Sequence, residues 1–286
     1  MYKATSPVTH PLRPPLALRR PAILWPAWVR TFPWWLAAIL LLAGAVGLSV
    51  ATQPSFQQAF RFISAGLAMT ALISVCAFAL SLIFGLLTGI GRLSKNVAAQ
   101  NAATFYVEVV RGVPMLVLIF FIAFVGVSGF VSVLNAVGSA AGIAWLSALN
   151  SKDIPMEVRA VAALSITYGA FLAEVFRAGI QSIPRGQMEA ARALGLSYPQ
   201  AMRYVILPQA IRNVLPALGN DFISMLKDSS LVSVLAIRDL TQTARLFAGQ
   251  TFQFNEAYTT LAVMYLLLTL MLSLLVKWLE KRMQRA

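Results

Sequence analysis

The sequence predicts an all-α integral membrane protein with about six transmembrane helices. Of its 286 residues, 59% are hydrophobic and 12% are charged, whereas a soluble domain usually carries about 25% charged residues. The mean hydropathy is +0.75. Apolar runs of about 18 or more residues, long enough to cross the roughly 30 Å hydrocarbon core as a helix, recur along the chain. The prediction therefore depends on no single segment.

Six apolar runs follow one another, and each predicts a membrane-spanning helix. They cover about residues 34–52, 64–90, 105–130, 158–180, 214–237 and 256–278. The first is an additional N-terminal helix, which we interpret as a retained anchor and not as a cleaved signal peptide, because its lead-in is too long and proline-rich. Pro114 is expected to kink the third. Gly85 and Gly89 give the second a patch for close helix contact.

The remaining segments predict a tail and connections. Residues 1–33 form a basic tail whose many prolines prevent a helix. Residues 131–157 form a long connection, and residues 238–255 form a second one. Between the fourth and fifth runs lies a polar, cation-rich stretch that is too patterned for a simple connector.

The basic residues predict the orientation. With six helices and both termini in the cytoplasm, the inside segments hold 16 of the 23 Lys and Arg residues, and the outside segments hold five. This asymmetry follows the positive-inside rule. It explains the formal net charge of +13 by topology and argues against a nucleic-acid partner.

The sequence offers no catalytic or metal-binding constellation. Cys76 is the one cysteine and His10 the one histidine, and they lie in an apolar run and in the proline-rich tail. No phosphate-cradling glycine loop is present, so the chain carries no ATPase motif of its own. We therefore expect no metal, no cofactor and no enzymatic activity in this chain.

The polar stretch 184–212 predicts two short amphipathic helices joined at Gly195. Ser197 and Gln200 form a capping box for the second helix, and Pro208 is expected to end it. Glu189 is expected near the start of the first helix, where a negative charge suits the helix dipole. An apolar ridge on the first helix comprises Met188, Ala191 and Leu194. This pattern fits a plug that docks into another protein, or else a helix pair lying on the membrane surface.

The same stretch resembles the EAA motif of ABC importer permeases. That motif reads EAA, three residues, G, nine residues, I, one residue and LP, and the chain departs from it only in Val205, where isoleucine is usual. The segments VEVVRGVPMLV (107–117), AEVFRAGIQSIPRGQMEAARALG (173–195) and FISMLKDSSLVSVL (222–235) resemble the polar amino acid uptake subfamily. The resemblance covers residues 62–282, and the first 55 residues extend beyond it.

The resemblance implies a type I importer permease (MetI-like) fold and a function. It implies the permease subunit of a bacterial inner-membrane importer for polar amino acids, with ATP and Mg bound by separate cytoplasmic ATPase subunits. An extracytoplasmic binding protein would deliver the substrate, and a second permease copy or a paralogue would complete the pathway. The residues that would couple this chain to the ATPase are Glu189, Ala190, Ala191, Gly195, Leu207 and Pro208.

Charges inside the predicted helices are functional candidates because they are costly in lipid. Glu108 with Arg111, and Glu174 with Arg177, are spaced to form structural ion pairs on single helices. A polar stripe on the fifth helix is expected to line the route, or else to serve helix packing or gating, and its carboxylates and cation suit a zwitterion. With a rim charge on the sixth helix, the candidates are Asp221, Ser224, Lys227, Asp228, Ser229 and Glu256.

Three other functions remain open at the level of sequence. A self-sufficient secondary transporter or channel for small polar solutes is the main alternative, although no internal repeat is evident. A membrane-embedded enzyme would need polar residues gathered at one place, and here they are scattered among helices. A scaffold for other membrane proteins would show no substrate-dependent activity.

Overall fold

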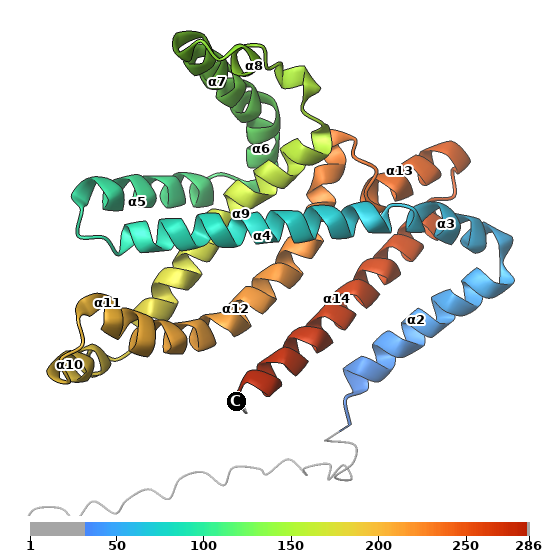
Figure 1. The fold of residues 1–286 in the computed structure, drawn as a ribbon. Helices are drawn as coiled ribbons and strands as arrows, with labels where there is room; N and C mark the ends of the chain where they lie inside the picture. The colour runs from blue at the N-terminus through green and yellow to red at the C-terminus, as the bar shows by residue number, and fades with distance from the viewer. Residues whose placement is uncertain (1–31, 285–286) are drawn as a thin grey trace, which may run out of the picture. The chain divides into compact units, whose positions relative to one another are not determined.

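The computed structural model describes residues 32–284, and every regular element among them is helical (Figure 1). The expected tail, residues 1–33, lies almost wholly outside the described residues. The chain divides into two compact units, residues 1–41 and 42–286. The helices are α2 (Trp34–Thr52), α3 (Pro54–Ser64), α4 (Leu67–Arg92), α5 (Val97–Gly112), α6 (Met115–Phe120), α7 (Val127–Ala141), α8 (Ala144–Ser147), α9 (Met156–Gln181), α10 (Arg185–Ala193), α11 (Tyr198–Ala201), α12 (Leu207–Asp228), α13 (Leu240–Thr251) and α14 (Phe254–Gln284).

Five helical segments of the described chain are long and apolar enough to cross a membrane. They are Trp34–Thr52, Pro54–Arg92, Met115–Ala141, Met156–Gln181 and Phe254–Arg282. The fifth apolar run expected from the sequence, 214–237, has no counterpart among them. It falls on α12 and on a 3₁₀ segment, Ser229–Leu235, and α12 carries the acidic and basic side chains that lower its hydropathy. Its 22 residues still give a length of about 33 Å, enough to span.

The second unit is organised around α4 and α9, which pack side by side and run in the same direction (Figure 1). Gly85 and Gly89 make this contact possible. A Cβ atom at position 85 would lie 2.6 Å from the Leu172 Cβ, and one at position 89 would lie 3.0 Å from the Ala173 carbonyl oxygen. Side chains at either position would push the helices apart. The prediction of close helix contact at these glycines is confirmed.

The third expected helix is broken and not merely kinked. α5 ends at Gly112, Val113 is extended, and Pro114 precedes α6. Pro114 has no N–H to continue the ladder, and proline disfavours the helical conformation in the residue before it. A π-helical segment, Phe121–Gly126, then joins α6 to α7. Helix therefore extends to Ala141, into a region expected to be a connection.

Pro208 does not end a helix as the sequence suggested. The chain is helical without interruption from α11 through a π-helical segment, Met202–Ile206, into α12, and Pro208 lies in the first turn of α12. The wider π turn precedes the proline and accommodates the backbone group that it leaves unbonded. The expected connection 238–255 likewise contains a helix, α13.

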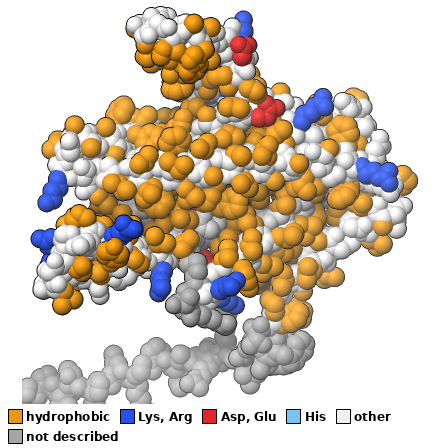
Figure 2. Space-filling model, in the orientation of Figure 1, with side chains coloured by type: hydrophobic (Ala, Val, Ile, Leu, Met, Phe, Trp, Pro, Cys, Tyr) orange, Lys and Arg blue, Asp and Glu red, His pale blue; other side chains and the backbone are white. Residues whose placement is uncertain are grey.

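The surface fits a lipid environment. On the face drawn in Figure 2, hydrophobic side chains cover most of the area, and the Lys and Arg side chains lie toward its edges. Large apolar side chains that are exposed include Leu72, Leu87 and Phe130. A contiguous apolar surface of this extent on a soluble protein would be an aggregation hazard, whereas in a membrane it is solvated by acyl chains.

Candidate functional site

The predicted coupling segment folds as two short helices joined by a tight turn. α10 ends at Ala193, and Gly195 adopts φ +86°, a left-handed conformation that costs other residues about 1–2 kcal/mol. The Leu196 amide donates to the Ala191 carbonyl at 3.2 Å, which closes the helix end. The capping box of Ser197 and Gln200 is present, with the Ser197 amide donating to Gln200 Oε1 at 2.8 Å. These local predictions are confirmed.

The two faces of this segment differ in a way that the sequence did not indicate. Met188 and the buried Ala191 face the chain itself, with Met188 packed on a small cluster of Ile183, Ile206 and Ala210. The expected ridge therefore does not project outward, except for Leu194, which is 84% exposed. The sequence alone did not show that α10 would fold back on the start of α12.

The exposed face carries both charge and apolar side chains. Glu189 and Ala190 are exposed, as are Tyr198 and Tyr204. Since α10 begins at Arg185, Glu189 lies in its second turn, and the dipole argument for this residue does not hold. Leu194 and Tyr198 lie one and three residues from Gly195, so the turn has an exposed apolar tip with polar groups beside it, which is typical of a protein-docking surface.

The polar residues expected along the fifth helix lie on α12 and the segment after it, and one of them is hydrogen-bonded to α9. The Tyr168 hydroxyl donates to Asp228 Oδ2 at 2.6 Å. Asp221 and Ser224 are half-buried, Lys227 is exposed, and the buried Ser229 hydroxyl donates to the Leu226 carbonyl at 2.7 Å. Sequence reasoning missed Tyr168 because an isolated tyrosine in an apolar run gives no signal of its own.

Glu256 lies apart from this network. It is half-buried in the first turn of α14, and no hydrogen bond or ion pair joins it to α12 within residues 32–284. The structure therefore brings Asp228 and Tyr168 together and leaves Glu256 as a separate charge.

An apolar cavity of about 420 Å³ lies beside α12, between α4 and α14. Phe78, Phe222 and Val276 are among its lining residues, and Arg212 and Glu280 are the charged ones. None of the carboxylates of the α12 stripe lines it. An apolar lining of this kind does not suit a small zwitterion, because the polar groups of the solute would be left without hydrogen bonds.

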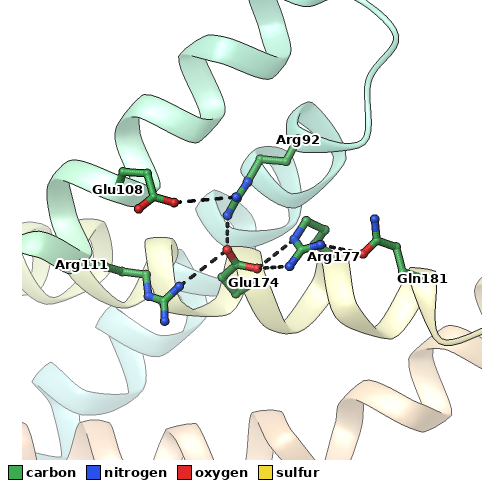
Figure 3. Close-up of polar contacts among 6 residues, drawn as sticks. All are labelled: Arg92, Glu108, Arg111, Glu174, Arg177 and Gln181. Atoms are coloured by element: carbon green, nitrogen blue, oxygen red, sulfur yellow. Dashed lines mark hydrogen bonds and ion pairs between the residues drawn. The ribbon is translucent and has the colours of Figure 1, made fainter.

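The charges on α4, α5 and α9 form one cluster (Figure 3). The pair of Glu174 and Arg177 is confirmed at 2.7 Å, and Arg177 also donates to Gln181 at 2.6 Å. Glu108 and Arg111 do not pair with each other as expected. Glu108 lies 3.9 Å from Arg92, and Arg111 lies 3.6 Å from Glu174.

Arg92 was the residue that sequence reasoning missed in this cluster. It hydrogen-bonds Glu174 from the last position of α4. The spacing of charges along one helix favours pairs within that helix, whereas the close packing of α4 on α9 brings a cation from 82 residues away.

Comparison with known proteins identifies the family. Residues 81–285 match the family described as "Binding-protein-dependent transport system inner membrane component". The chain belongs to this family. It is accordingly a multi-pass permease of a bacterial ABC importer, and ATP hydrolysis resides in a partner ATPase subunit of the complex.

Curated relatives and solved structures agree with this assignment. The chain is 38% identical over 227 residues, 79% of this chain and 95% of the other, to a probable glutamine ABC transporter permease protein (GlnM) of Bacillus subtilis strain 168. It is 37% identical over 219 residues, 77% and 91% of the two chains, to the glutamine transport system permease protein GlnP of Escherichia coli strain K12.

Among solved structures, a chain of an amino acid ABC transporter crystallised with histidines matches this permease with a TM-score of 0.66 and 38% identity, covering 78% of this chain and 94% of the other. A chain of an inward-facing MetNI methionine ABC transporter matches with a TM-score of 0.54 and 22% identity, covering 82% and 98%. The second match supports the fold alone, and it is the MetI-like fold expected from the sequence.

Proposed function

We propose that this permease carries a polar amino acid of the glutamine type across the bacterial inner membrane. The proposal rests on two relatives of 37–38% identity that are named as glutamine permeases. The half-buried carboxylates of α12 support it further, because they suit an ammonium group in a low-dielectric setting. An extracytoplasmic amino-acid-binding protein would deliver the substrate.

The coupling role of residues 184–212 is the central part of this proposal. The observation that carries it is Gly195, held at φ +86° beneath an exposed apolar tip. Glu189, Ala190, Ala191, Gly195, Leu207 and Pro208 would form or position the part of the chain that docks on the ATPase subunit. The small side chains at 190 and 191 suit close approach, and docking would move α9 and α12, which flank the segment.

The complex is proposed to contain a second permease copy or a paralogue. The polar face of α12 needs a wet pathway or a protein neighbour, since lipid would leave its carboxylates unsolvated. Both termini are assigned to the cytoplasm on the distribution of Lys and Arg. The additional helix, residues 34–52, is treated as a separate element, and the permease proper as residues 62–282.

A Gly195→Asp variant tests the coupling proposal. The side chain would enlarge the tip where the ATPase docks, and the charge would be desolvated there. We expect ATP-dependent glutamine uptake and recovery of the ATPase subunit with the tagged chain to fall together, by roughly tenfold or more, as for loss of a binding hot spot. Gly142→Asp is the matched control, since Gly142 is also exposed, has open space around it and adopts a left-handed conformation with φ +69°.

Two outcomes would contradict the proposal. If the Gly195→Asp variant recovers the ATPase subunit and takes up glutamine as the wild type does, this segment does not couple the chain to the ATPase. Uptake by the wild-type chain alone, without any ATP-binding partner, would favour the self-sufficient secondary transporter or channel instead.

A further inference from the structure

Glu174 connects three helices at the level where α9 approaches the coupling segment. It lies seven residues before the end of α9 at Gln181, and α10 begins four residues later at Arg185. Cations from α4, α5 and α9 converge on its carboxylate (Figure 3). They are Arg92, Arg111 and Arg177. A single side chain therefore contacts all three of these elements.

Both oxygens of Glu174 are engaged. Oε2 accepts a hydrogen bond from Arg177 Nε at 2.8 Å, and Arg177 Nη2 lies 2.7 Å from the same oxygen, so this oxygen is held by a charge-assisted contact. Oε1 faces Arg92 and, at 3.6 Å, Arg111. Because one carboxylate serves three cations, removing its charge would leave three guanidinium groups to repel one another.

The three contacts are unequal in strength. The side chains of Arg92 and Glu174 are only 14% and 22% exposed, and α4 and α9 are also held together along their length by close packing at Gly85 and Gly89. Arg111 is 46% exposed and lies at the longest of the distances. The link to α5 is therefore the weakest of the three, and it joins α5 to the two helices that are packed together.

Arg111 stands next to a break in the chain. α5 ends at Gly112, Val113 is extended at φ −106° and ψ 137°, and α6 starts after Pro114. A glycine, an extended residue and a proline between two helices form a hinge, where a few backbone dihedrals absorb a rotation. The carboxylate of Glu174 thus holds the residue that precedes this hinge.

We propose that Glu174 is a positioning residue that transmits movement of the coupling segment to the hinge at Gly112–Pro114. This inference rests on the proposed coupling function. When the coupling segment moves, α9 carries Glu174 with it, and the carboxylate draws Arg111 and the end of α5 along. α6 and the π-helical segment beyond it then change their angle to α9, which alters the route on that side of the permease.

A purely structural role for the cluster would give a different result. If Glu174 only held α4, α5 and α9 together, its loss would lower the amount of assembled transporter, and each assembled complex would still move substrate normally. A role in transmission would leave assembly and ATP hydrolysis in place and lower the amount of substrate moved per ATP. The ratio of uptake to hydrolysis separates the two roles.

The experiment uses the full complex in proteoliposomes, with the binding protein and labelled glutamine. Glu174→Gln keeps the shape of the side chain and removes its charge. We expect it to retain the ATPase subunit and ATP hydrolysis and to lower uptake per ATP by roughly fivefold to a hundredfold, the usual range for loss of coupling between sites. Glu174→Asp should recover part of the uptake, because it restores the charge.

Two further variants make the test decisive. Glu157→Gln is the matched control, since Glu157 is the other glutamate of α9 and has no ion pair in the described part of the chain; it should transport as the wild type does. Arg111→Gln removes the exposed link to Glu174, together with the contact of the Arg111 guanidinium over the Phe171 ring, and should lower uptake per ATP in the same direction. If Glu174→Gln fails to assemble, the Arg111→Gln variant decides the matter.

Unchanged uptake per ATP in the Glu174→Gln variant would overturn the inference, as would unchanged uptake per ATP in Arg111→Gln. Failure of the broader proposal looks different. In that case the wild-type complex itself would show no ATP-dependent uptake, and none of the cluster variants would be informative about coupling.

Discussion

Asp239 has a fully buried side chain at the start of α13, outside the candidate membrane-spanning segments. Its Oδ1 accepts a hydrogen bond from the Gln242 amide at 2.8 Å, so it caps the helix. Gly66 presses on its backbone, because a Cβ atom at position 66 would lie 2.5 Å from the Asp239 carbonyl carbon. Burial raises the pKa of Asp239 from 3.8 to about 6.

This raised pKa predicts a loss of stability as the pH rises. Below pH 3.8 the Asp239 carboxyl is protonated in the folded and in the unfolded chain, and its contribution to the free energy of unfolding is complete. Between pH 3.8 and about 6 the carboxyl is ionised in the unfolded chain and still protonated in the folded one. The free energy of unfolding should therefore fall by up to about 3 kcal/mol across this window. Thermal unfolding in detergent at pH 4 to 7 measures the effect.

Asp239→Asn is the informative variant for this prediction. Asparagine keeps an oxygen for the Gln242 amide and cannot titrate. The unfolding temperature of the variant should therefore lack the decrease between pH 4 and 6 that Asp239 causes in the wild type. Equal pH dependence of the wild type and the variant would show that the buried carboxyl does not titrate as its surroundings imply.

Single residues differ in how far the sequence predicted them. The glycine turn at 195 and the capping box after it are encoded within a few consecutive residues, and both were predicted. Arg92 and Tyr168 were not, since their partners Glu174 and Asp228 lie 82 and 60 residues away. Such contacts depend on which helices become neighbours, and local spacing does not contain that information.

At the scale of elements, composition predicted where helices lie better than where they break. Gly85 and Gly89 correctly marked α4 as a close-packing helix, but nothing in its own sequence named α9 as the partner. The third expected helix, residues 105–130, runs across the break between α5 and α6, because apolar residues continue on both sides of Gly112 and Pro114. Hydropathy describes how well side chains suit an apolar environment, and it does not detect a break of the backbone inside an apolar run.

The polar face of α12 leads to a prediction for substrate handling. Asp228→Asn keeps an acceptor for the Tyr168 hydroxyl and removes the charge proposed to meet the substrate ammonium. A charge-assisted hydrogen bond contributes about 1.5–3 kcal/mol, so uptake at low substrate should fall roughly tenfold to a hundredfold, while recovery of the ATPase subunit stays unchanged. Initial rates of glutamine uptake across a concentration series measure this effect.

Asp153→Asn is the control for this variant, because Asp153 is exposed in the segment between α8 and α9 and the substitution is the same. Tyr168→Phe, which removes only the hydroxyl, should give a smaller loss than Asp228→Asn. If uptake by Asp228→Asn depends on substrate concentration as it does in the wild type, the polar stripe of α12 does not line the route and serves helix packing or gating.

For the molecule as a whole, the number of membrane crossings differs between the sequence prediction and the helices of the structure. Five segments meet the length and hydropathy of a span, whereas the charge distribution was explained with six. α12 is the difference between the two. If it crosses the membrane, the coupling segment before it and α13 after it lie on opposite sides. If it does not, they lie on the same side.

Labelling of single cysteines distinguishes these topologies. Cys76 would be replaced by serine, and a cysteine would be placed at Gln187 in α10 or at Gln250 in α13, both of which are exposed. We expect a membrane-impermeant maleimide to label position 250 in intact spheroplasts and position 187 only after the membrane is opened. A carboxylate-bearing helix can span only beside water or protein, so this pattern would also place the α12 stripe within the assembled transporter. Labelling of both positions from one side would exclude α12 as a crossing and, with it, a route along that helix.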